Sequence, residues 1–304
     1  MRRLLAVATL ALVGCANHGI PKDRRVETMF PASAPLAELP DQFKVVTFNV
    51  HMEPGEKVAP AILADRAIRD ADVIIMQEVH RSGLGCSGAC EVAKRLGYYA
   101  LYAPGHAAKD GDDGIAILSK APITSSQLIV LPYFDVHFNS GRRVAMAATI
   151  QHAGKPITFY AVHLDNRLDV DERRIQMIPV LEHAKRQQTP VVIAGDFNTS
   201  PFTWIDHVVP VLTTTQDNYF EKLVRSYGFD TPCSDSGPTH RYIGMKLDGI
   251  YTRGFTTKRF AVARAKDVSD HMALWATLIG VKPAATPIKP SVRTAPPRTV
   301  AAAN

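Results

Sequence analysis

Short apolar runs rich in β-branched residues recur between residues 43 and 278 and predict many strands. The expected strands are Phe43–Val50, Asp72–Gln77, Gly114–Leu118, Leu128–Leu131, Val144–Ile150, Ile157–Leu164, Val191–Ala194, Leu247–Tyr251, Phe260–Ala263 and Met272–Leu278. Some runs are continuous, which is typical of strands buried on both faces. In Val144–Ile150 the side chains of Val, Met, Ala and Ile fall on one face, which predicts a half-buried strand.

Helical periodicity occurs in fewer places. Val58–Ala71 and Asp169–Lys185 place apolar side chains three and four residues apart, and we expect Pro179 to kink the second helix. A shorter helix is expected at Glu91–Leu96, and Arg173 and Arg174 are expected on a solvated helix face. Many strands with few helices between them predict an α/β domain of two packed sheets with outer helices.

Composition narrows the class of protein. The chain has 304 residues, of which 46% are hydrophobic and 21% charged, so it resembles ordinary globular proteins rather than disordered or collagen-like chains. The longest apolar run, Leu4–Val13, is shorter than the roughly 20 residues that span a bilayer. Glycine-rich phosphate loops are absent from the sequence, so nothing indicates nucleotide-cofactor chemistry.

The first residues have the pattern of an export signal. Met1–Arg3 is basic and Leu4–Val13 is apolar, and the run closes with Leu12-Val13-Gly14-Cys15. This end resembles the lipobox of bacterial lipoprotein precursors, which implies that residues 1–14 are removed and that Cys15 carries lipid. Ala16 rather than Asp after the cysteine favours the outer membrane of a Gram-negative bacterium, facing the periplasm or the surface. An ordinary signal peptide with a chance cysteine is the alternative.

The segments on either side of the strand-rich region differ from it in composition. Residues 15–40 contain prolines and no apolar period, so we expect a tether, and residues 41–280 then form the catalytic domain. Residues 281–304 are rich in proline and lack acidic residues, which predicts a disordered basic tail. The net charge of +6 comes from these ends: Arg2, Arg3, Lys282, Lys289, Arg293 and Arg298. The tail suits an anionic surface, lipid or nucleic acid, or only solubilises the chain.

The cysteines fit an exported protein. Disulfides form in the oxidising compartments that exported chains reach. Cys86 and Cys90 are spaced to close a small loop, which leaves Cys233 free, or Cys233 pairs with either of them. A zinc site is not indicated, because no His/Cys pair follows at zinc spacing.

Several apolar runs end or begin with a polar side chain that could take part in catalysis or bind a metal. These residues are Asn49, Glu78, His163, Asp196 and Asn198, Asp248, and Asp270 with His271. A charged group at the mouth of a strand costs free energy unless it is paired or bound to a metal. Carboxylates and Asn suit a hard cation such as Mg²⁺, with Mn²⁺ as a substitute. Histidines near acids supply proton transfer, so the set matches metal-assisted attack of water on phosphorus.

The same stretches, in order, resemble the endonuclease/exonuclease/phosphatase superfamily, which includes deoxyribonuclease I. They are Thr47-Phe48-Asn49, Gln77-Glu78, Gly114–Ser119, His163-Leu164-Asp165, Gly195-Asp196-Phe197-Asn198, Asp248-Gly249-Ile250 and Ser269-Asp270-His271. The resemblance implies a four-layer α/β sandwich of two facing mixed sheets with outer helices. The site would lie at one end of the sheets.

The resemblance also assigns roles. Metal ligands would be Glu78 with Asn49 beside it, and Asp270 as a further ligand. Asp196 would orient or activate water, Asn198 would donate to the phosphate, His271 oriented by Asp248 would contact the phosphate, and His163 would be the second catalytic histidine. Which histidine is the general acid, and whether one metal or two are bound, stay open.

Other residues near these motifs have less defined roles. His51 follows Asn49 by two residues, so its side chain either faces the substrate or has no catalytic role. Asp165 is expected near the site, without an assigned role. Arg142 and Arg143 begin a strand, and alternation puts them on opposite faces, so at most one is expected to reach a phosphate.

The predicted function is therefore that of a Mg²⁺-dependent phosphoesterase, favoured as a nuclease-like phosphodiesterase and expected to be a monomer. A lipid-headgroup phosphodiesterase similar to sphingomyelinases, and a phosphomonoesterase, are the alternatives within this class. A surface module that binds a partner without catalysis is the alternative outside it. The complete set of site residues counts against that module, because a binding protein need not keep them all.

Overall fold

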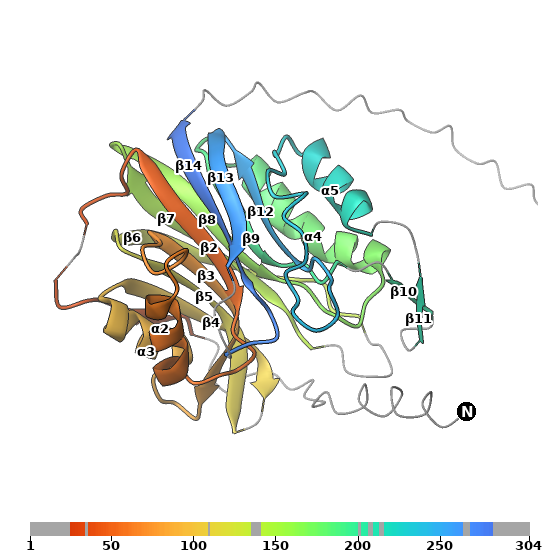
Figure 1. Ribbon diagram of the computed structural model, residues 1–304, viewed down its shortest axis with the longest axis horizontal. Helices are drawn as coiled ribbons and strands as arrows, with labels where there is room; N and C mark the ends of the chain where they lie inside the picture. The colour runs from red at the N-terminus through yellow and green to blue at the C-terminus, as the bar shows by residue number, and fades with distance from the viewer. Residues whose placement is uncertain are drawn as a thin grey trace, which may run out of the picture.

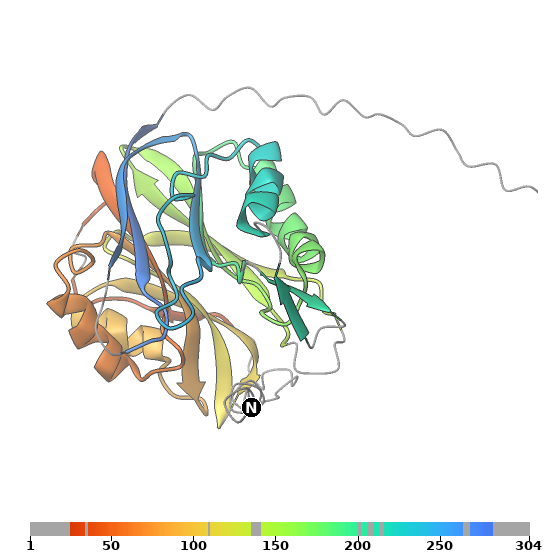
Figure 2. The ribbon, with the colours of Figure 1, turned by 45° about the vertical axis from the view of Figure 1, so that its right-hand side comes forward.

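Two β-sheets face each other in the structure, with helices outside each sheet (Figures 1 and 2). The structure is a computed structural model and describes residues 25–33, 36–108, 110–134, 141–199, 202–205, 209–212, 216–263 and 268–281. The expected signal peptide, the lipidated Cys15 and the basic tail from residue 282 onward lie outside the described residues. Within the described residues, no helix is both long and apolar enough to span a bilayer.

The first sheet has seven strands among the described residues, in the order β1-β4-β5-β3-β2-β14-β13. Their bounds are β1 Glu27–Met29, β2 Gln42–Asn49, β3 Val73–Ser82, β4 Tyr99–Ala108, β5 Gly111–Ser119, β13 Phe255–Ala263 and β14 Ala273–Val281. β2 runs parallel to β3 and antiparallel to β14, with Leu274 opposite Thr47. The start of the last strand therefore lies beside the end of β2.

In the part of the chain that the structure describes, the second sheet has five strands in the order β12-β9-β8-β7-β6. Their bounds are β6 Ile123–Val130, β7 Val144–His152, β8 Lys155–His163, β9 Val191–Asp196 and β12 Asp248–Arg253. In the register of this sheet, Asp196 lies opposite His163 on one side and opposite Asp248 on the other. A separate hairpin is formed by β10 Phe202–Ile205 and β11 Val209–Leu212.

The helices complete four layers. α2 Gly55–Ala64 and α3 Gly88–Leu96 cover the first sheet, whereas α4 Val170–Lys185 and α5 Gln216–Ser226 cover the second (Figure 2). Buried apolar side chains fill the space between the sheets, and further clusters fill the space under each helix pair. Removing this apolar surface from water is the main favourable term in folding. The four-layer α/β sandwich expected from the sequence is confirmed.

Some elements differ from their sequence-predicted bounds. The helix expected at Val58–Ala71 begins at Gly55 and ends at Ala64. It ends there because Asp65 is extended and its side chain accepts a hydrogen bond from the Ala67 backbone N–H, which closes a turn in place of the next helical turn. α4 continues through Pro179 and ends at Lys185, which is the end that the sequence predicts.

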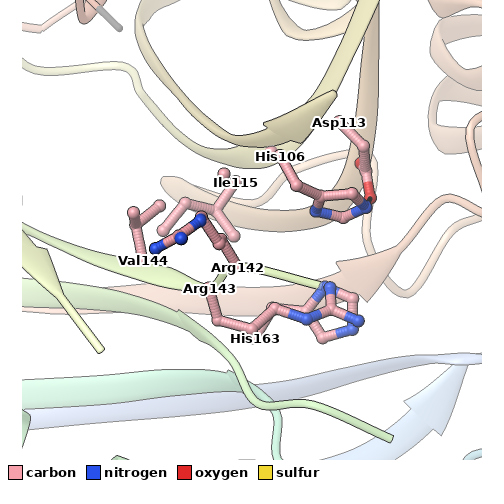
Figure 3. Close-up of a pocket in the computed structure, with 9 residues that line it drawn as sticks. His106, Asp113, Ile115, Arg142, Arg143, Val144 and His163 are labelled. Atoms are coloured by element: carbon pink, nitrogen blue, oxygen red, sulfur yellow. Dashed lines mark hydrogen bonds and ion pairs between the residues drawn. The ribbon is translucent and has the colours of Figure 1, made fainter. Parts of the chain in front are cut away.

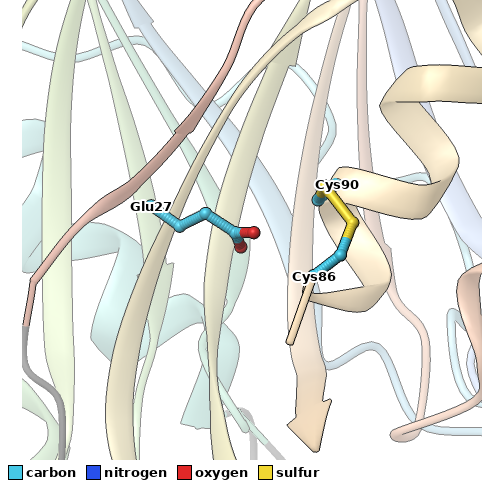
Figure 4. A group of neighbouring side chains, drawn as sticks. All are labelled: Glu27, Cys86 and Cys90. Atoms are coloured by element: carbon cyan, nitrogen blue, oxygen red, sulfur yellow. A yellow bond between two sulfur atoms is a disulfide. The ribbon is translucent and has the colours of Figure 1, made fainter. Parts of the chain in front are cut away.

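Part of the expected tether lies against the folded body. β1 pairs with β4, and Leu39 is 1% exposed, with its N–H donating to the Gln151 carbonyl. The Glu27 carboxylate also accepts from the Ser87 N–H, beside a disulfide between Cys86 and Cys90 (Figure 4). Ordered contacts therefore begin before residue 41. The disulfide closes the small loop, and Cys233 is free and buried.

The prediction that Arg173 lies on a solvated helix face is wrong. The Arg173 side chain is 0% exposed and donates to Gln216 Oε1 at 2.7 Å, which ties α4 to the start of α5. Burial lowers the pKa of Arg173 to about 10, while Asp165 and other nearby acids oppose that shift. The charge survives in the interior because acids surround it.

Arg173→Met is expected to lower the free energy of unfolding by about 3–5 kcal/mol, because it removes one partner of a buried polar network. Arg174→Met is the matched control. Arg174 pairs with the exposed Asp171, so its loss should cost about 1 kcal/mol or less. Urea unfolding of both variants measures the difference. Equal stability of the two variants would contradict a structural role for Arg173.

Candidate active site

The sequence-predicted site residues come together at one end of the facing sheets. The first sheet supplies Asn49 from β2, Glu78 from β3, and Asp270 and His271 from the turn before β14. The second sheet supplies His163 from β8, Asp196 from β9 and Asp248 from β12. Because parallel strands end at the same edge of a sheet, each sheet presents its polar groups at one mouth.

Glu78 is placed by an irregularity in β3. The pairing of β3 with β5 shifts register between Met76 and Val79, and Glu78 has φ 50°. Such a left-handed conformation costs roughly 1–3 kcal/mol for a residue with a side chain. Because of this conformation, the Gln77 side chain forms a hydrogen bond with Thr47 in the interior, while Glu78 Oε1 accepts a hydrogen bond from Asn49 Nδ2 at 3.0 Å. A bulge that re-aims a side chain is typical of functional sites.

Asn49 links the two sheets. Its Nδ2 donates to Glu78 Oε1 at 3.0 Å and to Asp196 Oδ2 at 2.9 Å, while its Oδ1 accepts from the His51 backbone N–H. The amide is thereby fixed in orientation, with its hydrogens toward the carboxylates. An amide binds a metal through its oxygen, and in Asn49 that oxygen, Oδ1, accepts the hydrogen bond from the His51 backbone N–H.

Asp196 occupies the centre of the cluster. Its Oδ1 accepts from the Asn198 N–H, and its Oδ2 lies 3.7 Å from both His163 Nε2 and His271 Nε2. Burial raises the pKa of Asp196 to about 7; His271 opposes this shift and Asp248 adds to it. A carboxyl group with a pKa near neutrality is suited to accept a proton from water.

His271 forms a pair with Asp248. Its Nδ1 lies 2.9 Å from Asp248 Oδ2, which holds Nδ1 as a donor and leaves Nε2 facing Asp196. Burial lowers the pKa of His271, but the carboxylates of Asp248 and Asp196 outweigh burial and raise it to about 10. Asp248 is itself fixed, because Thr239 Oγ1 accepts from its backbone N–H. This imidazole is held protonated and aimed at the centre of the site.

His163 has the opposite environment. Arg143 Nη1 lies 2.9 Å from His163 Nδ1, and because a guanidinium only donates, Nδ1 must accept. Burial, and then the charge of Arg143, hold the pKa of His163 well below its usual range. His163 is therefore neutral, with its proton on Nε2, which faces Asp196 and lies 4.0 Å from Glu78 Oε1.

Asp270 lies at the edge of the cluster. Its Oδ2 is 3.4 Å from His240 Nε2, and its Oδ1 is 3.8 Å from His51 Nδ1. Although burial opposes it, the hydrogen bond from His240 and the nearby histidine charges hold the pKa of Asp270 well below its usual range. The His51 side chain is 55% exposed, so it faces solvent at the rim. His240 was not predicted; it lies in a loop whose sequence carries no signal for the site.

The remaining predicted residues support this centre from the turns after β8 and β9. Asn198 has φ 52°, and its Nδ2 donates to the Leu164 carbonyl, so it ties the two turns together. Asp165 is buried and accepts from the Arg167 N–H. Of the two arginines before β7, Arg143 reaches His163, whereas Arg142 lies over the Tyr133 ring. Both precede the strand, which begins at Val144, so strand alternation does not decide their directions.

The carboxylates of this cluster fit a divalent cation. Glu78 and Asp196 each offer a carboxylate oxygen, and these atoms and a ring nitrogen of His163 lie within 4.8 Å of one another. His163 Nε2 carries its proton toward this cluster, so the two carboxylates are the ligands that the pair supplies. The cluster also concentrates carboxylates: Asp248 raises the pKa of Asp196, so a positive charge there would relieve the repulsion. Asp270 groups instead with His240 and His271. Carboxylate oxygens are the ligands that hard cations prefer.

The fold and this cluster together are typical of a hydrolytic centre that acts on phosphate esters. The sequence matches the model of the endonuclease/exonuclease/phosphatase family over residues 46–271, and the chain belongs to that family. It is accordingly a hydrolase of phosphate ester bonds, in a family that generally depends on divalent metal. No curated protein matches the sequence.

Solved structures show the same fold. An endonuclease/exonuclease/phosphatase from Beutenbergia cavernae is 20% identical, with a TM-score of 0.63 over 80% of this chain and 72% of that chain. A mannosyl-6-phosphatase from Bacteroides thetaiotaomicron is 16% identical, with a TM-score of 0.59 over 78% and 99%. D. rerio TDP2 complexed with a single-strand DNA product is 16% identical, with a TM-score of 0.56 over 78% and 98%. These likenesses concern the fold.

Proposed function

We propose that this hydrolase is a monomeric, Mg²⁺-dependent phosphodiesterase with nuclease-like chemistry. The observation that carries the proposal is the pair of imidazoles in opposite states on either side of Asp196, each with Nε2 at 3.7 Å from Oδ2. A diester with an alkoxide leaving group needs both a donor to the phosphate oxygens and a proton for the leaving oxygen. His163 and His271 supply two such groups.

The residues then have the following roles. Glu78 would hold the cation, with Asp196 beside it and Asn49 fixing both carboxylates. When bound, Mg²⁺ would neutralise charge on the phosphate oxygens and stabilise the transition state. Asp196 accepts a proton from the attacking water, His163 donates a hydrogen bond to the phosphate, and His271 protonates the leaving oxygen. Asn198 and Asp270 border the centre as donor and further ligand.

The substrate class has a direct test. With Mg²⁺, bis(p-nitrophenyl) phosphate is expected to turn over faster than p-nitrophenyl phosphate. Asp196→Asn is expected to lower turnover of this diester by about a hundredfold or more, because it removes the group that accepts the proton of the attacking water. His271→Ala is expected to lower cleavage of DNA to a similar extent, because an alkoxide leaving group needs the proton that p-nitrophenolate does not. Initial rates on the two matched esters and on DNA measure these effects. Faster turnover of the monoester would favour the phosphomonoesterase, and diester cleavage that survives both substitutions would refute the mechanism.

A lipid-headgroup phosphodiesterase is the second candidate function. This candidate requires that the enzyme is held close to a membrane. We propose that the protein is exported and anchored in the outer membrane through lipid on Cys15. The Cys86–Cys90 disulfide supports export, because such bonds persist in oxidising compartments. An anchor would keep the site near anionic headgroups at high effective concentration.

The anchor predicts a difference in fractionation. The wild-type protein is expected in the membrane fraction with a lipid label, and Cys15→Ser is expected to lose the label, since the sulfur is the point of attachment. Metabolic labelling with a fatty acid and separation of membranes measure both results. The matched control is Cys233→Ser, which removes a buried free cysteine and should keep the label. A soluble, unlabelled wild type would exclude the anchor.

A further inference from the structure

A small pocket adjoins the site on the side of His163. It lies where β4 and β5 of the first sheet meet β7 and β8 of the second, and its polar lining comes from His106, Asp113, Arg142, Arg143 and His163 (Figure 3). From this lining the site described above uses His163 and the Nη1 of Arg143 that holds it. Asp113 and the Nε of Arg143 have no role there, so they can contact a different part of the substrate.

Asp113 presents an unsatisfied acceptor in this pocket. The residue is 4% exposed, and its Oδ1 is buried without a hydrogen-bond partner in the described part of the chain. Its Oδ2 lies 3.7 Å from His106 Nε2. A buried carboxyl oxygen without a hydrogen-bond partner is destabilising, so a ligand that donates to Oδ1 gains binding free energy.

Arg143 presents an unsatisfied donor in the same pocket. Its Nη1 is used by His163 Nδ1, whereas its Nε is buried and makes no hydrogen bond to any residue that the structure describes. The pocket thus holds a buried unpaired acceptor, Asp113 Oδ1, and a buried unpaired donor, Arg143 Nε. A hydroxyl group both donates and accepts, so it has the chemistry to pair with either atom. An apolar group would leave both atoms unpaired.

We propose that this pocket receives a hydroxyl group of the alcohol part of the substrate, with Asp113 Oδ1 as acceptor and Arg143 as donor. The proposal rests on the proposed phosphodiesterase function and names the chemistry of its substrate. His163 sets the position, because its Nε2 faces the catalytic centre and its Nδ1 faces Arg143. The hydroxyl therefore lies close to the scissile phosphate, as in the ester of a sugar or of glycerol.

Matched substrates test the proposal. The first pair is the p-nitrophenyl phosphate diester of uridine at its 5′ position and the 2′,3′-dideoxyuridine equivalent. The second pair is glyceryl and propyl p-nitrophenyl phosphate. In at least one pair we expect kcat/KM to favour the hydroxylated member by about tenfold or more, because the deoxy member leaves buried polar atoms unpaired. A preference within the uridine pair would indicate a nucleoside ester as the substrate, and a preference within the glyceryl pair would indicate a glycerol ester.

Variants assign the preference to the pocket. Asp113→Leu removes the acceptor at similar volume and is expected to bring the ratio of the two kcat/KM values close to one. Asp113→Asn keeps the shape with a weaker acceptor and should give an intermediate ratio, which tests the pocket even if the Leu variant does not fold. The control Asp110→Asn changes an exposed carboxylate before the same strand and should keep the wild-type ratio.

A binding measurement separates this proposal from the proposed function. Calorimetry with wild-type protein compares uridine 5′-phosphate with its 2′,3′-dideoxy form, and glycerol 3-phosphate with propyl phosphate, without any turnover. Tighter binding of a hydroxylated member, lost in Asp113→Leu, supports the pocket even if no diester is cleaved. Equal binding and equal kcat/KM within both pairs would overturn the proposal, as would a wild-type ratio retained by folded Asp113 variants.

Discussion

Glu78→Gln is expected to lower kcat/KM by about a thousandfold or more while the protein stays folded. The substitution removes charge at nearly constant volume from the carboxylate best placed to hold the cation. A bound cation contributes several kcal/mol to stabilising the transition state, and each 1.36 kcal/mol corresponds to about a tenfold change in rate. The measurement is kcat/KM over a Mg²⁺ titration, in which the variant should also need far more Mg²⁺ for half-maximal rate.

The matched control for this prediction is Glu56→Gln. Glu56 is an exposed residue in the first turn of α2, so its substitution should leave both the rate and the Mg²⁺ response unchanged. Thermal unfolding of both variants confirms that the folds are comparable. A Glu78 variant with wild-type activity and the same Mg²⁺ response would remove this residue from the metal site.

Asp248→Asn is expected to reduce kcat by up to about ten-thousandfold, the loss seen when an orienting carboxylate loses its charge beside a catalytic imidazole. The Asn side chain fits the same space, but it neither fixes Nδ1–H of His271 nor stabilises the protonated ring. Asp235→Asn, an exposed position in the loop before β12, is the matched control. A variant with near-normal kcat would show that His271 works without this partner.

The pH profile gives a second test of the same pair. Asp248 helps raise the pKa of His271 to about 10, so the protonated imidazole is present below that pH and is lost as the pH rises through it. Without the carboxylate the pKa falls, and the protonated form is lost at lower pH. The alkaline limb of the kcat profile should therefore move to lower pH in Asp248→Asn, and an unmoved limb would assign that limb to another group.

Most central strands of the two sheets could be predicted because they are buried, and burial leaves a continuous apolar signature. β4 was not predicted, since Pro104 and Gly105 interrupt its sequence where its pairing with β5 shifts register. α5 was not predicted either, because tertiary contacts with the second sheet decide its position more than its local sequence does. The length of α2 depended on a hydrogen bond from a turn at Asp65, a feature that apolar periodicity does not report.

The site was predictable to the extent that its groups stand at strand ends. Asn49, Glu78 and Asp196 follow apolar runs directly, and sheet geometry brings such ends together. Contacts made by loops and by strand starts carry no such signal. His240 reaches Asp270 from a loop, and Asp113 lies at the start of β5 rather than beyond a strand end. The burial of Arg173 also had no local signal, because its partner Gln216 is on another helix.

The pairing of β14 with β2 has a consequence for synthesis of the chain. His271 stands just before β14, and β14 fills the place between β2 and β13 in the first sheet. A nascent chain that ends before residue 271 lacks both the protonated imidazole and the strand that seats it beside Asn49. Hydrolytic activity can therefore arise only when translation has passed β14.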